Sequence, residues 1–219
     1  MSFPQVAASI LLETGCVNFR PEDPFTLTSG RKSPVYIDCR RLISFPRARA
    51  VLMDMAVDLM SEEAGYEAFD AVAGGETAGI PFAAWISERL MLPMLYVRKK
   101  PKGFGRNARI EGDVVPHHRV LLVEDLATDG GSKLDFIRAM REAELSVAHC
   151  FVIFEYGIFA ESKTSLASEG VKLHHLANWD DVVTEAQRCG HYPDETIAQV
   201  RHFLSDPDGW EEATSTAAS

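Results

Sequence analysis

The spacing of hydrophobic residues changes along the chain, and with it the element that each segment predicts. Residues 4–15 (PQVAASILLETG) and 46–65 (PRARAVLMDMAVDLMSEEAG) repeat apolar residues at helical spacing and stop at a glycine, so both predict amphipathic helices. Between them, residues 25–38 (FTLTSGRKSPVYID) place β-prone flanks around a polar turn. This pattern predicts a hairpin, or a strand, loop and strand.

From residue 69 onward, short apolar runs alternate with helical patterns. The runs that predict strands are FDAVAGG (69–75), MLYVR (94–98), RVLLVED (119–125) and VAHCFVIF (147–154), and a further apolar run, VKLHHLA (171–177), follows them. The patterns that predict helices are AGIPFAAWISERL (78–90), SKLDFIRAMREAE (132–144) and two segments at about 180–185 and 195–204. The alternation is typical of βαβ units, so we expect an α/β fold with a central, mainly parallel sheet flanked by helices.

Length and composition predict one domain over residues 1–210, followed by a disordered tail at 211–219 that has no apolar periodicity. No apolar run reaches the roughly 18 residues of a membrane helix, and the N-terminus lacks the basic region of a signal peptide. We therefore expect a cytoplasmic protein. The four cysteines are widely spaced, so the sequence indicates neither a zinc site nor a disulfide framework.

Charge is unevenly distributed. The chain has 32 acidic and 22 basic residues and a net charge of -10, which argues against a nucleic-acid-binding or membrane-binding surface. Six of the basic residues nevertheless lie within residues 98–109 (RKKPKGFGRNAR), where there is no acid. Glycines at 103 and 105 would let this loop close over an anionic ligand, as a lid does. A solvated charged loop is the alternative.

A second polar segment follows the strand RVLLVED. Glu124 and Asp125 are expected at the solvent edge of the sheet, where paired carboxylates accept hydrogen bonds from sugar hydroxyls or lie near Mg²⁺. The next residues, TDGGS (128–132), lead into a helix and offer small residues, hydroxyls and backbone N–H groups to a phosphate. A capped helix alone would explain TDGGS, but not the acids and the cationic loop. Dinucleotide and P-loop fingerprints are absent from this loop.

These segments together resemble a known family. Residues 120–132 are similar to the phosphoribosyl pyrophosphate motif of type I phosphoribosyltransferases, and residues 25–38 and 96–112 resemble orotate phosphoribosyltransferases in particular. With GGETAGIP (74–81), four motifs occur in order over nearly the whole chain. The resemblance implies the type I fold, with a small hood built from the N-terminal and C-terminal segments.

The resemblance also implies roles for individual residues. Lys102, Asp125 and Arg98 would be catalytic, and Thr28, Ser29, Tyr36 and Thr128 would contact orotate. Residues that would bind phosphoribosyl pyrophosphate come from the lid and the strand end: Arg98, Lys99, Lys102, Glu124, Asp125, Leu126, Ala127, Thr128, Asp129, Gly130, Gly131 and Ser132. In this scheme Glu124 and Asp125 hold the ribose hydroxyls, residues 128–132 hold the 5′-phosphate, and the glycines of GGETAG approach the pyrophosphate.

The implied activity is a glycosyltransferase reaction: transfer of the phosphoribosyl group to N1 of orotate, giving orotidine 5′-phosphate for UMP synthesis. Mg²⁺ would be the cofactor, bridging substrate oxygens without a direct protein ligand. A homodimer that shares loop 98–109 across its interface is implied as well. Two alternatives stay open: transfer to another base, such as a purine, and a regulator that senses phosphoribosyl pyrophosphate.

Four positions depart from the family pattern. Thr28 stands where many members have Lys, Phe104 where the lid often has His, and Glu155 near the place where relatives carry an Arg toward the base. Asp129 replaces a Thr or Ala, and a carboxylate there would repel a phosphate. We therefore expect Asp129 to point away from the phosphate or to cap the following helix.

Overall fold

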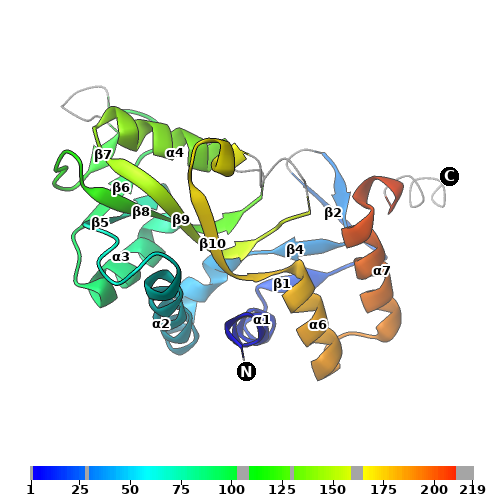
Figure 1. Cartoon of the computed structure of the whole chain (residues 1–219). Helices are drawn as coiled ribbons and strands as arrows, with labels where there is room; N and C mark the ends of the chain where they lie inside the picture. The colour runs from blue at the N-terminus through cyan, green and yellow to red at the C-terminus, as the bar shows by residue number, and fades with distance from the viewer. Residues whose placement is uncertain (1, 28–29, 103–108, 129–130, 159–164, 211–219) are drawn as a thin grey trace. The chain divides into compact units, whose positions relative to one another are not determined.

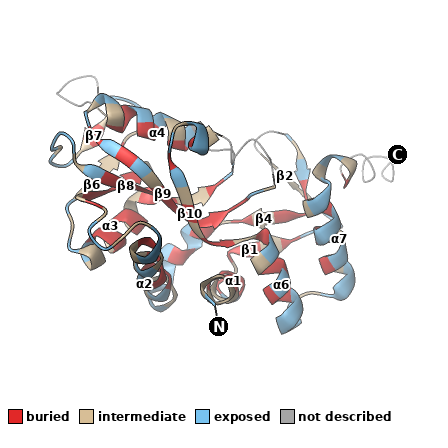
Figure 2. Cartoon of the chain, viewed as in Figure 1, coloured by how far each residue is buried: buried red, intermediate tan, exposed pale blue. Residues whose placement is uncertain are grey.

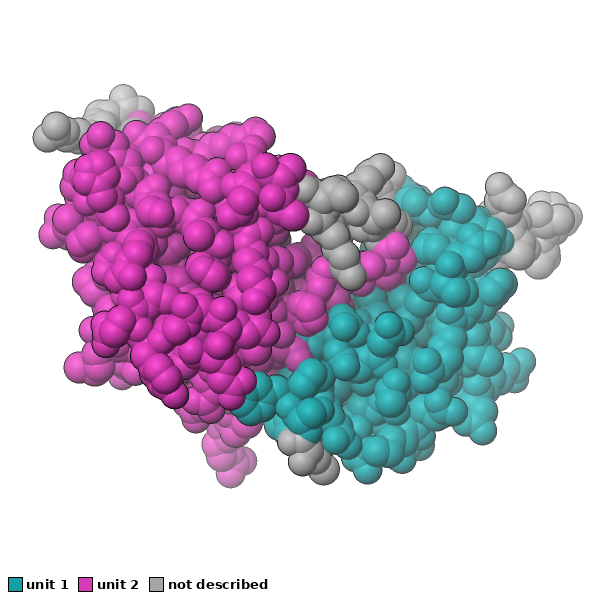
Figure 3. Space-filling view, viewed as in Figure 1, with its two compact units in different colours: residues 1–45, 177–219 teal, residues 46–176 magenta. Residues whose placement is uncertain are grey.

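The computed structural model describes residues 2–27, 30–102, 109–128, 131–158 and 165–210 (Figure 1). It divides into two compact units, unit 1 with residues 1–45 and 177–219 and unit 2 with residues 46–176 (Figure 3). Unit 1 therefore consists of the N-terminal and C-terminal segments, the composition expected for the hood. The single-domain boundary at residue 210 stays a prediction.

Unit 2 is built on a six-stranded sheet. Its strands, in the spatial order of the sheet, are β10 (Lys172–Asn178), β9 (Ser146–Glu155), β8 (Arg119–Ala127), β5 (Ala71–Gly75), β6 (Met94–Val97) and β7 (Ile110–Glu111). The pairs β9–β8, β8–β5 and β5–β6 are parallel, and β7 runs antiparallel to β6. The predicted, mainly parallel sheet is confirmed, with the short edge strand β7 added to it.

Helices cover both faces of this sheet. α4 (Gly131–Glu142) packs Phe136, Ile137 and Met140 onto the face that carries Ala73 and Leu122. On the other face, α3 (Gly79–Leu90) packs against β5 and β8, and α2 (Pro46–Glu63) packs against α3. Buried residues follow the inner strands and the inward sides of these helices (Figure 2). The apolar patterns read from the sequence thus correspond to burial on two faces.

Unit 1 contains α1 (Phe3–Glu13), which packs against α6 (Trp179–Cys189), and α7 (Asp194–Ser205), which packs against α6. Its strands are β1 (Val17–Phe19), β2 (Phe25–Thr26), β3 (Lys32–Ser33) and β4 (Val35–Ile37), followed by the 3₁₀ helix η1 (Cys39–Ser44). β2 and β3 form the predicted hairpin, whereas β4 pairs with β1. No helix in the described parts of the chain could cross a membrane.

A chain of polar contacts, running from an exposed glutamate to a buried histidine, joins α2 to β9 and β10. Glu63 contacts His174 through Oε2 and Nδ1 (2.8 Å), and His174 Nε2 lies 2.9 Å from His149 Nδ1. The His174 side chain is completely buried, and this burial lowers its pKa to about 4. Lys172 also binds the Glu63 carboxylate (2.8 Å). Both imidazoles are therefore favoured in their neutral form, which permits a proton to be shared along the chain.

Candidate active site

Polar side chains gather where β5, β6, β8 and β9 end. Because β8, β5 and β6 are adjacent and parallel, their carboxyl ends lie at one edge of the sheet, where ligands bind in open α/β folds. The segments that follow these strands are 76–78, 98–109 and 128–130, and each belongs to a motif singled out in the sequence. The fold thus brings the three predicted motifs to the same edge.

Glu124 is the most constrained residue at this edge. β5 and β8 are in register at Gly74 and Val123, so Gly75 and Glu124 are neighbours on the same face. A Cβ atom on Gly75 would lie 1.7 Å from Glu124 Oε1 and 2.6 Å from the Phe136 ring. The Glu124 carboxylate therefore occupies the space that any side chain at residue 75 would need.

The surroundings of Glu124 are largely apolar. The residue is 7% exposed, and its Oε1 has no hydrogen-bond partner among the described residues. Desolvation raises the pKa of this carboxyl to about 8, an effect that Asp125 reinforces and that Lys133 and Lys99 oppose. Glu124 is thus a buried acid that titrates near neutral pH, as functional carboxyls in clefts often do.

Asp125 has a different environment. β8 extends to Ala127, so consecutive side chains at 124 and 125 point to opposite faces of the strand. Asp125 is partly exposed. The prediction that both acids lie at the solvent edge is correct for Asp125 and wrong for Glu124, which the glycine at residue 75 allows to fold inward. The two acids therefore reach the edge from two sides of one strand.

The predicted phosphate loop is shorter than the sequence indicated. Leu126 and Ala127 belong to β8, where Ala127 pairs with Glu155 and its carbonyl accepts a hydrogen bond from the Tyr156 N–H (2.7 Å). Thr128 is exposed, and α4 begins at Gly131. The first turn of this helix directs N–H groups toward the edge. Asp129 and Gly130 lie outside the described residues, so the expectation for Asp129 stays a prediction.

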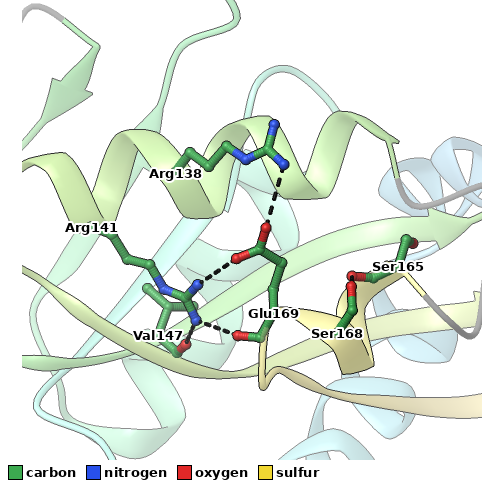
Figure 4. Close-up of polar contacts among 6 residues, drawn as sticks. All are labelled: Arg138, Arg141, Val147, Ser165, Ser168 and Glu169. Atoms are coloured by element: carbon green, nitrogen blue, oxygen red, sulfur yellow. Dashed lines mark hydrogen bonds and ion pairs between the residues drawn. The ribbon is translucent and has the colours of Figure 1, made fainter.

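α4 is anchored to the rest of unit 2 by two arginines (Figure 4). Arg141 donates hydrogen bonds to the backbone carbonyls of Val147 (3.0 Å) and Glu169 (2.8 Å). The Glu169 carboxylate accepts from Arg141 (3.1 Å) and from Arg138 (3.3 Å). These contacts hold α4, whose N-terminus faces the carboxyl edge, against β9 and the segment that ends at Glu169.

The cationic lid is described at its two ends. Arg98 and Lys102 both pair with Glu111 of β7, the former at 3.6 Å. Arg109 forms a two-pronged ion pair with Asp135 of α4. Glu111 lies just beyond the acid-free window noted in the sequence, and only the β6–β7 pairing brings it near Arg98. Residues 103–108, which include Phe104 and Arg106, lie outside the described residues.

The glycine motif at 74–79 is hydrogen-bonded to the chain at the start of the cationic loop 98–109. The Glu76 N–H donates to the Val97 carbonyl (2.9 Å), and the Lys99 N–H donates to the Glu76 carboxylate (2.7 Å). Lys99 itself is exposed. A Cβ on Gly79 would lie 2.3 Å from the Val123 carbonyl, so α3 starts in direct contact with β8. The motif is therefore bound to both neighbouring strands.

The residues expected to contact orotate are described in part. Thr28 and Ser29 lie outside the described residues. Tyr36, in β4 of unit 1, packs its ring against Phe25 with centroids 5.2 Å apart and is partly buried. This contact packs Tyr36 against the β2–β3 hairpin, and its role toward orotate stays a prediction. Thr128 belongs to unit 2, whereas Tyr36 belongs to unit 1.

Sequence reasoning did not foresee the burial of two charged residues near the edge, Glu155, which it had noted only as a departure from the family pattern, and Lys133. Glu155 ends β9, is 7% exposed and contacts His175 of β10 at 3.0 Å. Lys133, in the first turn of α4, is 3% exposed. An acid directly after an apolar run, as at Glu124, was the available signal for Glu155. No local signal marks Lys133, because a lysine in a helix is ordinarily exposed.

Comparisons with known proteins agree with this architecture. The family model "Phosphoribosyl transferase domain" matches residues 45–188. The orotate phosphoribosyltransferase of Cereibacter sphaeroides is 58% identical over 97% of this chain and 92% of that protein, and that of Dinoroseobacter shibae is 57% identical over 97% and 96%.

Solved structures give the same result. The orotate phosphoribosyltransferase of Aeropyrum pernix is 32% identical with a TM-score of 0.71, covering 85% of this chain and 99% of that one. The UMP synthase of Leishmania donovani is 28% identical with a TM-score of 0.77, covering 91% of this chain and 41% of that one. The chain described here therefore belongs to the phosphoribosyltransferase family and, within it, to the orotate phosphoribosyltransferases.

Proposed function

We propose that this chain transfers the 5-phosphoribosyl group of phosphoribosyl pyrophosphate to N1 of orotate, giving orotidine 5′-phosphate and pyrophosphate for UMP synthesis, at the carboxyl edge of its six-stranded sheet. The observation that carries this placement is the convergence at that edge of three features: a carboxylate seated over Gly75, the N-terminus of α4 and the cationic segment after β6. They match a ligand with ribose hydroxyls, a phosphate and a pyrophosphate.

In the proposed complex, Asp125 and the accessible side of Glu124 accept hydrogen bonds from the ribose hydroxyls. The 5′-phosphate lies against residues 128–132 and the first N–H groups of α4, where the helix dipole favours an anion. Lys99 and the backbone of the 74–79 motif face the pyrophosphate. Each anionic part of the substrate thereby meets a donor supplied by a different strand end.

The lid cations act on the leaving group. As pyrophosphate departs from C1, positive charge develops on the ribose and negative charge on the pyrophosphate. In the structure, Arg98 and Lys102 pair with the Glu111 carboxylate. Binding of pyrophosphate would replace Glu111 by a more highly charged anion. Cations held in place on the leaving group stabilise the transition state more than the ground state.

Mg²⁺ is part of the proposal. Within the described residues, no group of three or more His, Cys, Asp or Glu side chains converges to hold a metal ion. We expect Mg²⁺ to be bound mainly by substrate oxygens and water, the coordination that this cation prefers. Mg²⁺ on the pyrophosphate would supply positive charge to the leaving group.

The proposal extends to the assembly and the compartment. We expect a cytoplasmic homodimer in which loop 98–109 of one subunit reaches the site of its partner, without nucleic-acid or membrane partners. Mixing a Lys102→Ala variant with an Asp125→Asn variant tests the shared lid. Activity restored on mixing is the expected result, because one site of the mixed dimer then has both residues intact. No restoration in verified mixed dimers would place the lid in its own subunit's site.

The reaction itself is tested by following the loss of orotate absorbance with phosphoribosyl pyrophosphate and Mg²⁺. Adenine, guanine and uracil serve as alternative bases under the same conditions. Turnover of orotate alone is the expected outcome. Turnover of another base without orotate, or binding of phosphoribosyl pyrophosphate without any turnover, would overturn the proposed function.

A further inference from the structure

Arg109 connects the cationic loop 98–109 to the helix that follows the phosphate loop. Its Nη1 donates a hydrogen bond to Asp135 Oδ1 of α4 (3.0 Å), and its Nη2 donates to Asp135 Oδ2. Its Nε donates to the Arg98 carbonyl (3.1 Å), and the Arg98 N–H donates to the Arg109 carbonyl (2.7 Å). We call these four hydrogen bonds the Arg109 clasp. They join the end of β6 and the start of β7 to α4.

The clasp continues the pairing of β6 with β7 by one step. Val97 pairs with Ile110, and Arg98 and Arg109 are the next residues of the two chain segments. Residues 98 and 109 are also the two ends of the cationic loop, so the clasp joins these ends to each other. It involves no residue between them. It is therefore compatible with a loop that reaches the site of the partner subunit.

The start of the loop is held from a second side by the glycine motif. The Lys99 N–H donates to the Glu76 carboxylate (2.7 Å), and the Glu76 N–H donates to the Val97 carbonyl (2.9 Å). Lys99, which faces the pyrophosphate in the proposed complex, thus directly follows a residue of the clasp. Its backbone is fixed between the glycine motif on one side and Arg98 on the other.

Asp135 brings the clasp close to the second anion-binding element of the edge. It lies four residues after Gly131, where α4 begins, which is about 6 Å along the helix axis. The N–H groups of the first turn face the 5′-phosphate in the proposed complex. α4 also contacts β6 (Figure 1). The clasp therefore connects the element expected to bind the pyrophosphate with the element expected to bind the 5′-phosphate.

The geometry of the clasp matters more than its contribution to stability. The Asp135 side chain is 56% exposed and that of Arg109 is 21% exposed, and ion pairs near the surface add little to the free energy of unfolding. A two-pronged pair between arginine and carboxylate fixes the orientation of both groups. The Arg109 guanidinium also lowers the pKa of the Asp135 carboxyl, so the pair stays ionised at neutral pH. The main effect of the clasp is thus to set a position.

We propose that Arg109 is a positioning residue of the phosphoribosyl pyrophosphate site: its clasp holds Lys99 and the N-terminus of α4 at a fixed separation, so that the pyrophosphate and the 5′-phosphate of one substrate are bound together. This inference rests on the proposed function, because it assumes that these two elements bind the two ends of the substrate. Binding of one end then presents the other end to a site already in place, which raises its effective concentration.

The test compares the binding of three ligands in the presence of Mg²⁺: phosphoribosyl pyrophosphate, pyrophosphate and ribose 5-phosphate. Titration calorimetry gives the Kd values, and inhibition constants replace them where binding is weak. In Arg109→Met the Kd for phosphoribosyl pyrophosphate should rise about tenfold or more, since small misplacements of positioned groups cost up to about 10². The constants for pyrophosphate and ribose 5-phosphate should stay nearly unchanged, because each of these ligands uses one element alone.

Initial rates provide an independent readout. The value of kcat/KM for phosphoribosyl pyrophosphate should fall with its affinity in Arg109→Met, whereas the KM for orotate should stay unchanged. Equal losses for all three ligands would overturn the inference, because they would indicate general damage to the site. Unchanged affinity for phosphoribosyl pyrophosphate would overturn it as well.

Arg119→Met is the matched control. Arg119 makes the same two-pronged pair with Asp70, but it is the first residue of β8 and lies at the opposite end of that strand from the site. This variant should leave the constants for all three ligands unchanged. A loss of phosphoribosyl pyrophosphate affinity as large as in Arg109→Met would contradict the inference, because loss of a surface ion pair would then suffice.

A second pair of variants acts on the exposed partner in the clasp. Asp135→Asn should reproduce the selective loss of phosphoribosyl pyrophosphate affinity, and Asp135→Glu, which keeps the carboxylate, should restore most of it. These variants decide the matter if Arg109→Met does not fold, and unchanged affinity in Asp135→Asn would refute the clasp. Absence of both phosphoribosyl pyrophosphate binding and orotate turnover in the unmodified chain would instead refute the proposed function.

Discussion

Glu124→Gln should make the protein's stability much less sensitive to alkaline pH. The structure buries the Glu124 carboxylate and raises its pKa from 4.5 to about 8, so the folded state favours the protonated form. The stability that this preference provides is fully present below about pH 4.5 and is lost as pH rises through about 8. Glutamine resembles the protonated acid in shape and cannot ionise, so the variant should lack this loss.

The size of the effect follows from the shift. A rise from 4.5 to about 8 is roughly 3.5 units, and at about 1.36 kcal/mol per unit it corresponds to an upper value of about 4 to 5 kcal/mol between pH 5 and pH 9. Relaxation and water entry reduce such values in real proteins, so a measured difference of about 2 kcal/mol or more would agree with the structure.

The assay is the free energy of unfolding from urea titrations at pH 5 to 9, compared between the unmodified chain and Glu124→Gln. Glu62→Gln, which changes an exposed glutamate of α2, is the matched control for a general effect of net charge. Parallel stability curves for the unmodified chain and Glu124→Gln would refute the reasoning. They would mean that the Glu124 side chain is solvated and does not occupy the space over Gly75.

Further predictions concern other parts of unit 2. His174 is held neutral in the folded state with a pKa of about 4, so stability is lost as pH falls from about 6.5 to about 4. His174→Gln should reduce this loss by up to about 3 kcal/mol, which urea unfolding at these pH values measures. Gly75→Ala should destabilise the fold by about 1 to 3 kcal/mol, seen in melting curves, and lower kcat/KM by displacing Glu124. Lys102→Ala should lower kcat about 10² to 10³ in the orotate assay. Glu111→Gln should lower the KM for phosphoribosyl pyrophosphate up to about fivefold in initial-rate measurements, since a competing ion pair is lost. Unchanged kinetics in both lid variants would contradict the role of the lid.

Much of the fold was predictable because its longer elements carry a local pattern. The helices at 3–13 and 46–63 and the strands at 71–75 and 119–127 each bury one face or both, and the spacing of apolar residues records that burial. The short strands β1 and β7, of three and two residues, were not predicted, because so few positions cannot establish a period and no turn motif marks them. Their pairing with β4 and β6 depends on partners elsewhere in the chain.

In the candidate site, too, some features were predictable from local sequence and others depend on tertiary contacts. The adjacent acids, the glycine motif and the cationic run were singled out from the sequence alone, and the fold brings them to one edge of the sheet. Which side chains occupy that edge depended on tertiary contacts: Glu111 meets Arg98 through strand pairing, and Lys133 is buried because α4 covers the sheet. These are relations between residues from different elements, and no local spacing encodes them.

The sequence by itself determined the order of the elements, the parallel sheet and the chemical character of the ligand, since these follow from local periodicity, composition and motif order. Only the tertiary structure decided the state of Glu124. Its burial depends on the register of β8 against β5, which places Gly75 beside it, and on α4, which supplies Phe136 and Lys133. The sequence does not show whether a glutamate is exposed or buried. Burial against a glycine removes water from the carboxylate, and this desolvation raises its pKa only once the chain has folded.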